Sequence, residues 1–528
     1  IAIGCSGLFS NSTGIDNVAI GYQSLQTNTS GSQNVAIGNS AMINGTGGNN
    51  NVAIGRLALS DNTAHGNTAT GYASLQKNTT GTGNVANGYQ ALNNNTGQNN
   101  TAIGYEALAY NTSGVSNTAT GFEALYSNTT GGWNVANGID TLYNNTTGNY
   151  NIALGNEALY NNTTGTYNIA IGCNANYGIA STAGTITNGN YKIAIGYQSL
   201  YTSGGAEGTI AIGRNTLKNI TDVSTDNACV AIGDCALEHN TGSYNTGVGY
   251  HSMINNTSGS YNTALGHASL EVSSGTGTVG NFGVAVGYYA CYNNNGANYN
   301  TGVGYLAMGS GITTGDSNTA VGSLALRNLT GGIMNVAVGM QALYTNTGGS
   351  NNVAMGNNAL YSTLSSSNVA IGTEALYSNT SGDSNTAIGH QALNKNTTGI
   401  DNVACGYQAL YNNTASYNTA TGYLALSDNV GGSGNVATGY SALSDNVGGN
   451  NNTATGYQAL SANKSDNNTA TGWMALSAND DATNNTATGS SALQANLHGS
   501  YNVATGSNTL CSNTTGSRNT ATGYNALY

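Results

Sequence analysis

One short motif recurs along the chain and constrains its fold more than any other feature. It is first complete in Asn17–Gln33, NVAIGYQSLQTNTSGSQ, and returns at Asn34 as NVAIGNSAMINGTGGNN. The glycine that closes each x-Ala-x-Gly occurs 31 times from Gly4 to Gly523, mostly 16 or 17 residues apart. A short period sustained over a whole chain is typical of a solenoid. The sequence therefore predicts an all-β, rod-like β-solenoid of about 31 coils.

The composition is of low complexity, with 77 glycines, no proline and only 6% charged residues. Low-complexity polar chains are often disordered, but such chains usually carry high net charge and much proline. They also lack Ala, Gly and Leu at fixed positions. We therefore expect an ordered chain.

Charge and hydropathy exclude two classes of function. The net charge of −12 is spread over 528 residues, and no basic stripe is present to bind phosphates, so we expect no nucleic-acid partner. No run of 18 apolar residues exists, so this segment is not expected to span a membrane.

The strand pattern of one coil shows which residues share a face. In Asn17–Gly21, Val18 and Ile20 lie on one face and Ala19 on the other, because alternate strand residues point to opposite sides. The alanine site is Ala in 29 of 31 copies and Gly in two, Gly247 and Gly302, which indicates tight packing. We expect two or three short strands per coil and an amide ladder of the leading asparagines. A leucine spine is expected at Leu25, Leu59, Leu75, Leu92 and Leu108.

The array 1–528 is interpreted as one continuous repeat domain with three regions. Coils are regular over 1–172, carry loop insertions over 173–287, and are regular again over 288–528, rich in threonine from 419. The segments Ile179–Tyr191 and Glu271–Phe282 are candidate loops, either for recognition or as neutral length drift at an exposed turn. Both ends lie inside a motif, and we expect the array to belong to a longer chain.

No constellation for catalysis or cofactor binding is present, so we expect a protein that is not an enzyme and uses no cofactor or metal. The six histidines lack acidic partners at a useful spacing, and Glu106, Glu123, Glu157 and Glu374 form only a mild acidic patch. The seven cysteines show no metal-ligand spacing. Most are expected to fill apolar space, although Cys229 and Cys235 flank one strand and are candidates for a local disulfide.

Three sets of residues are candidate surface sites. The first is a Thr-Ala-Thr ladder: Thr419, Thr421, Thr453, Thr455, Thr469, Thr471, Thr486, Thr488, Thr520 and Thr522. The second is a set of Asn-x-Ser/Thr sequons, expected to be exposed and open to glycosylation unless they are simply good turns: Asn28, Asn78, Asn111, Asn128, Asn145 and Asn162. The third is a partly exposed tyrosine stripe that binds sugars or another chain, or packs against itself: Tyr22, Tyr72, Tyr89, Tyr105, Tyr407, Tyr423, Tyr440 and Tyr457.

The motif resembles known repeats. Asn-Val-Ala-Ile-Gly followed by a small residue is similar to the Ser-Val-Ala-Ile-Gly repeats of trimeric autotransporter adhesin heads. It is more similar still to the Asn-Thr-Ala-Ile-Gly-Tyr-Gln-Ala-Leu arrays of tail-fibre-type surface proteins. The resemblance implies a left-handed β-roll in which three chains assemble side by side, with the alanine face turned to the crowded interface.

Our leading hypothesis is a structural fibre or filament shaft, extracellular, on the cell surface or in a phage or virus fibre. Its partners would be copies of itself, as a homotrimer or a head-to-tail filament, and host or surface glycans. The alternative is a binding solenoid. The Thr-Ala-Thr ladder resembles the Thr-x-Thr faces of insect antifreeze solenoids and would bind ice, whereas the tyrosine stripe or the middle loops would bind glycans.

Overall fold

The structure is a computed structural model that describes residues 1–178, 189–202, 207–220, 228–272 and 279–528. Within these residues the regular elements are short β-strands, and there is no helix. The chain forms two compact units, the first built on Ile1–Leu265 and the second on Gly277–Tyr528.

The strands are short and evenly distributed along both units. The first unit contains Ala2–Ile3 (β1), Val18–Ile20 (β2), Val35–Ile37 (β3), Val52–Ile54 (β4), Thr68–Thr70 (β5), Val85–Asn87 (β6), Thr101–Ile103 (β7), Thr118–Thr120 (β8), Val135–Asn137 (β9), Ile152–Leu154 (β10), Ile169–Ile171 (β11), Ile193–Ile195 (β12), Ile210–Ile212 (β13), Val230–Ile232 (β14), Thr246–Val248 (β15) and Thr263–Leu265 (β16). The second contains Val284–Val286 (β17), Thr301–Val303 (β18), Thr319–Val321 (β19), Val336–Val338 (β20), Val353–Met355 (β21), Val369–Ile371 (β22), Thr386–Ile388 (β23), Val403–Cys405 (β24), Thr419–Thr421 (β25), Val436–Thr438 (β26), Thr453–Thr455 (β27), Thr469–Thr471 (β28), Thr486–Thr488 (β29), Val503–Thr505 (β30) and Thr520–Thr522 (β31).

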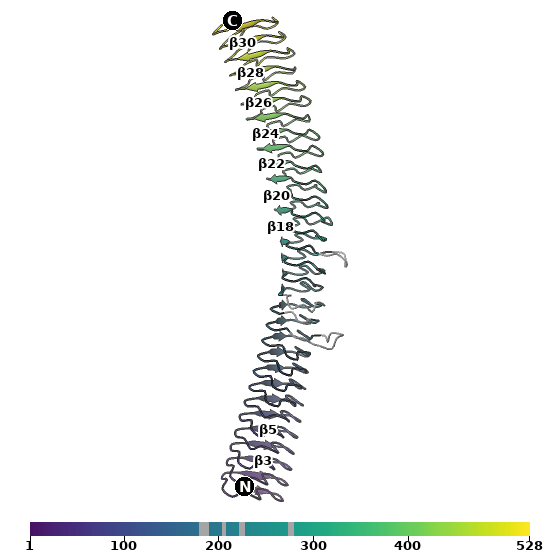
Figure 1. The fold of residues 1–528 in the computed structure, drawn as a ribbon, viewed down its shortest axis with the longest axis vertical. Helices are drawn as coiled ribbons and strands as arrows, with labels where there is room; N and C mark the ends of the chain where they lie inside the picture. The colour runs from purple at the N-terminus through teal and green to yellow at the C-terminus, as the bar shows by residue number, and fades with distance from the viewer. Residues whose placement is uncertain (179–188, 203–206, 221–227, 273–278) are drawn as a thin grey trace. The chain divides into compact units, whose positions relative to one another are not determined.

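Each strand pairs in parallel with the next strand of its unit, and equivalent repeat positions lie opposite one another. Val18 pairs with Val35 and Ala19 with Ala36, and the same register holds in the second unit, where Thr453 pairs with Thr469. In Figure 1 the coils of each unit are stacked with their strands aligned on one side. The predicted all-β solenoid is therefore confirmed.

Each coil of the described residues contains one strand of two or three residues, so the expectation of two or three strands per coil is wrong. The reason lies just after the closing glycine, where Gln23 (φ 57°) and Leu25 (φ 50°) adopt left-handed backbone angles. Hydrogen bonding between coils continues there nevertheless. The Gln23 N–H donates to Cys5 O (2.9 Å) and the Leu25 N–H to Ala41 O (3.0 Å), in the coils on either side.

The closing glycine is required by the close approach of neighbouring coils. Gly21 has φ +131°, and a Cβ placed there would lie 2.5 Å from the carbonyl oxygen of Gly38 in the next coil. No L-side chain fits that space. This contact explains why the position is glycine in every copy of the repeat.

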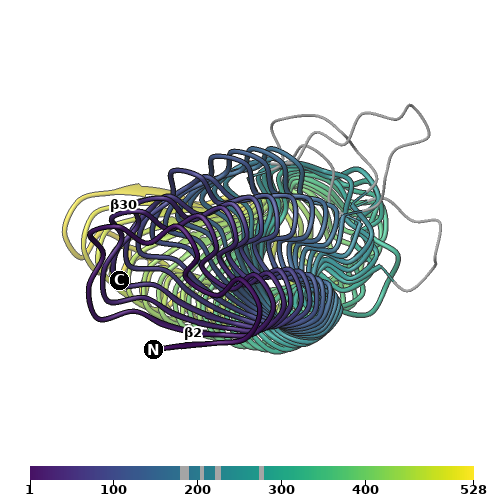
Figure 2. The ribbon, with the colours of Figure 1, turned by 90° about the horizontal axis from the view of Figure 1, so that it is seen from below.

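The core of each unit is narrow and lies inside the coils, which Figure 2 shows nearly end on as nested loops. The strand alanines and the predicted leucine spine are fully buried, as at Ala19 and Leu25, so the spine is confirmed. At Gly247 an added Cβ would lie 3.1 Å from Leu237 Cδ1. The alanine site is thus restricted by the chain's own core, and the expectation that this face meets another chain is wrong.

Asparagine precedes most of the strands and forms the predicted amide ladder, although Lys192, Thr209, Cys229 and Gly283 take its place before β12, β13, β14 and β17. Asn34 Nδ2 donates to Asn17 Oδ1 (3.2 Å), and Asn51 Nδ2 donates to Asn34 Oδ1 (3.1 Å). These side chains are buried. Because most of these amides face an equivalent amide in the next coil, most of them are hydrogen bonded within the chain. Asn168 Nδ2, which is followed in the ladder by Lys192, is a buried exception.

Two expectations concern the middle of the chain. Residues 179–188 of the candidate loop Ile179–Tyr191 and residues 273–278 of Glu271–Phe282 lie outside the described residues. Cys229 and Cys235, the candidate pair for a local disulfide, are free thiols, and the extended strand β14 lies between them. Across the described ranges, no helix has the length and apolar character that crossing a membrane requires.

Candidate functional site

The outer face of the strands in the second unit carries the predicted threonine ladder. Both threonines of a Thr-Ala-Thr strand point away from the core, because the alanine between them is buried. Parallel pairing places Thr455 beside Thr471 and Thr488 beside Thr505. Val436 and Val503 interrupt the first column. The result is a solvent-exposed face with two columns of side chains in register.

The sequon asparagines lie elsewhere than predicted. They are buried rather than exposed: Asn28, Asn78, Asn111, Asn128, Asn145 and Asn162. Asn128 Nδ2 donates to Asn111 Oδ1 (2.7 Å) and to Gly131 O (2.9 Å). These residues form a second ladder at the turns, in which the amide nitrogen that would carry a glycan is already used for hydrogen bonds. The expectation of exposure is therefore wrong.

The tyrosine stripe after the closing glycine is half exposed and stacked on itself. Tyr407, Tyr423 and Tyr440 have ring centroids 5.0 and 5.1 Å apart and nearly parallel planes. Their exposed fractions are close to 44%. The predicted packing between neighbours is confirmed, and one edge of every ring remains open to solvent.

The first unit contains a second tyrosine column that was not predicted from the sequence. It follows the spine position of each coil and contains Tyr126, Tyr143, Tyr160, Tyr177 and Tyr201, with centroids 5.0–5.2 Å apart. Aligning the residue after the spine position would have found it. The same alignment places Ala109 where the column should continue beyond Tyr126.

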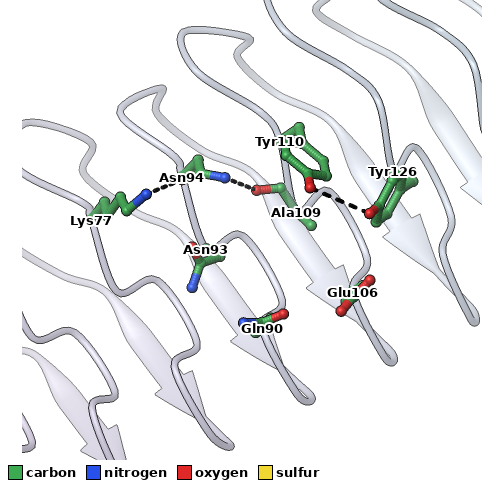
Figure 3. Close-up of a pocket in the computed structure, with 8 residues that line it drawn as sticks. All are labelled: Lys77, Gln90, Asn93, Asn94, Glu106, Ala109, Tyr110 and Tyr126. Atoms are coloured by element: carbon green, nitrogen blue, oxygen red, sulfur yellow. Dashed lines mark hydrogen bonds between the residues drawn. The ribbon is translucent and has the colours of Figure 1, made fainter.

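A cavity of about 250 Å³ lies at this interruption, and Figure 3 shows the side chains that line it. Above buried Ala109, Tyr110 turns toward Tyr126; the rings are 4.9 Å apart at 76°, and Tyr126 OH donates to Tyr110 OH (3.4 Å). On the opposite wall, Lys77 Nζ donates to Asn94 Oδ1 (2.9 Å).

Gln90, Asn93 and Glu106 complete the cavity. Asn93 is held by hydrogen bonds from its Nδ2 to Ala73 O (2.9 Å) and Gln76 Oε1 (3.2 Å). Because coil positions repeat, Gln90 and Glu106 occupy equivalent sites two residues after their closing glycines. The polar wall therefore combines amides, one carboxylate and one ammonium group.

The carboxylates along this side of the first unit influence one another. Burial, and then the charges of Asp140 and Glu106, raise the pKa of Glu123. The hydrogen bond with Tyr110, together with burial, raises the pKa of the Tyr126 phenol. Within the described ranges, no group of three or more His, Cys, Asp or Glu residues is arranged to hold a metal ion. The acidic patch is therefore not assigned a metal.

No family model matches the chain, and no curated protein matches it.

Proposed function

We propose that the chain is a non-catalytic shaft segment of an extracellular fibre or filament, which provides reach, stiffness and adhesion. The observation that carries the proposal is the continuity of bonding between coils within each unit. Strand pairs, turn backbones and buried amides all bond to the coil before and the coil after, as at Asn34. Such a stack resists bending because any bend lengthens many hydrogen bonds together.

Localisation on a cell surface or in a phage or virus fibre belongs to this proposal. It is supported by the sequence resemblance and by turns that contain few charges. Adhesion is supported by the exposed aromatic columns, since half-exposed rings offer apolar area beside polar groups. Copies of the chain are the first partners proposed, in a homotrimer or a head-to-tail filament.

Electron microscopy of the purified chain tests the shaft. A variant that duplicates residues 17–133, seven coils, is expected to give particles longer by about 34 Å at 4.8 Å per coil. Mass per length is expected near 0.35 kDa per Å for one chain and about three times that for a trimer. Particles that thicken without lengthening would refute the proposal.

A second candidate function is ice binding by the threonine ladder. It is favoured by the exposed, in-register columns at Thr453–Thr455 and Thr469–Thr471. A thermal-hysteresis assay of the parent and of Thr455→Tyr/Thr471→Tyr tests it. Activity in the parent that the double variant abolishes supports ice binding, and an inactive parent rules it out.

A further inference from the structure

The interruption of the second tyrosine column at Ala109 creates a site that its neighbours lack. From Tyr126 to Tyr201 each ring is covered by the next ring of the column. At Ala109 the column ends, and the ring of Tyr110 approaches Tyr126 at 76° instead of stacking on it. The space that a stacked ring would fill is the cavity of about 250 Å³.

The walls of this cavity are chemically unlike one another. One wall is aromatic, formed by Tyr110 and Tyr126, and 49% of the Tyr110 surface is exposed. The other wall presents the amide of Gln90 and the carboxylate of Glu106, beside Asn93, whose Nδ2 is already hydrogen bonded to Ala73 and Gln76 (Figure 3). The single ammonium group, Lys77, is hydrogen bonded to Asn94 at the rim.

We propose that this cavity binds one pyranose ring of a neutral glycan. A pyranose has a face of C–H groups that packs on an aromatic ring and a rim of hydroxyls that bond amides and carboxylates. The tyrosine pair and the polar wall offer both partners at opposite sides of one cavity. The volume suits a single sugar ring, since pockets for larger ligands begin near 300 Å³.

Charge argues against an anionic ligand. Glu106 and Lys77 leave the lining without net charge, and Glu123 and Asp140 follow Glu106 along the same coil position. A phosphate or carboxylate would meet this negative column. A zwitterionic amino acid is the competing ligand, with Lys77 and Glu106 as its partners, and the experiment below separates the two.

The test is saturation-transfer NMR on the full chain, with methyl β-D-glucopyranoside, methyl β-D-galactopyranoside and L-phenylalanine as probes at millimolar concentration. The decisive variant is Ala109→Tyr/Tyr110→Ser, which gives this coil the Tyr-Ser pair that the next coil has at Tyr126 and Ser127. The new tyrosine extends the second tyrosine column and fills the cavity. The variant is expected to fold, because the next coil already has the same pair of residues at this position. The control is Tyr143→Phe/Asn144→Ser, two coils along the stack.

We expect a saturation-transfer signal from at least one pyranoside with the parent and with the control. In Ala109→Tyr/Tyr110→Ser the affinity for that pyranoside should fall about tenfold or more. Glu106→Gln, which keeps the shape of the wall, should lower the affinity for the pyranoside without abolishing binding. No pyranoside signal in the parent, a signal unchanged in the filled variant, or preferential binding of L-phenylalanine would each overturn the proposal. The assay does not depend on the shaft function, because it reads ligand binding and not particle length.

Discussion

At the scale of single residues, the buried asparagines that precede most strands hold neighbouring coils together through their side-chain amides. The Asn134 amide donates to Asn117 Oδ1 (3.1 Å) and Gly148 O (2.8 Å) and accepts from Asn151 Nδ2 (3.0 Å). Asn134→Asp replaces the donor with a charge that cannot donate. We expect a loss of about 2 kcal/mol or more in unfolding free energy, measured by urea denaturation. The control is outward-facing Asn137→Asp, expected within about 0.5 kcal/mol of the parent; equal losses would contradict the role of the ladder.

Lys192 occupies one position of the same ladder, and its burial predicts how stability depends on pH. It is fully buried, and burial lowers its pKa from 10.5 to about 7, against an opposing effect of Glu207. Between pH 7 and 10.5 the unfolded chain therefore binds more protons than the folded chain. The contribution of Lys192 to stability should therefore rise with pH through this window, by a few kcal/mol in all, and be absent below it. The thiols of Cys229, Cys235 and Cys291, whose pKa values burial raises, contribute the opposite slope above pH 9.

Lys192→Asn restores the repeat residue and provides the comparison for this pH dependence. We expect it to raise the unfolding midpoint at pH 7, and to make the slope of the midpoint against pH less positive than in the parent between pH 7 and 10. Thermal unfolding followed by circular dichroism at several pH values measures both effects. A variant with the same pH slope as the parent would show that another group titrates.

The sequence predicted these residues unevenly. Period and composition were sufficient for the Asn17 ladder and the Leu25 spine, because a residue type that recurs at one position of most repeats must stack on itself when the coils stack. They were not sufficient to predict the burial of Asn128, because the residues Asn-Thr-Thr-Gly are equally favourable in a turn that is exposed to solvent. Its burial follows from the way the turn folds inward, which depends on the whole coil. The cavity at Ala109 depends on one coil having alanine where the following coils have tyrosine. A pattern averaged over all repeats does not show such a single difference.

At the scale of the element, the three-residue strand is defined by what lies on its two faces. Ala136 in β9 is fully buried, whereas Val135 beside it is 38% exposed. Ala136→Leu adds volume to a core without space for it, and we expect a loss of about 1–3 kcal/mol. Val135→Leu is the matched control and should be nearly neutral. Hydrogen exchange of β8, β9 and β10 locates the effect, and equal protection in both variants would contradict this assignment of faces.

The turn that follows the strand could not be predicted in the same way. Leucine rarely adopts positive φ, which costs on the order of 1 kcal/mol for each L-residue, so nothing in the motif itself indicates the left-handed backbone of Leu25 and its equivalents. The structure offsets this cost with hydrogen bonds between coils and with complete burial of the side chain. Both effects exist only in the stack, and no single copy of the motif contains them.

At the scale of the whole molecule, each unit is stabilised by contacts between neighbouring coils, so stability depends on register rather than on any one coil. Deleting residues 134–150 removes one complete coil of the first unit and joins Trp133 to Asn151, as Trp133 is now joined to Asn134. Every ladder then continues in register. We expect the thermal midpoint to change by less than about 4 °C.

Deleting only residues 134–141 is the matched control. It removes fewer residues but places the second half of one coil against the first half of the next, so Leu142 would lie outside the spine. The amides of Asn117 and Asn151, which the whole-coil deletion brings together, would not meet. We expect a much lower midpoint and loss of exchange protection on both sides of the deletion. If the half-coil deletion were tolerated as well as the whole-coil deletion, register would not be the source of stability. The cooperative unit would then be smaller than a coil.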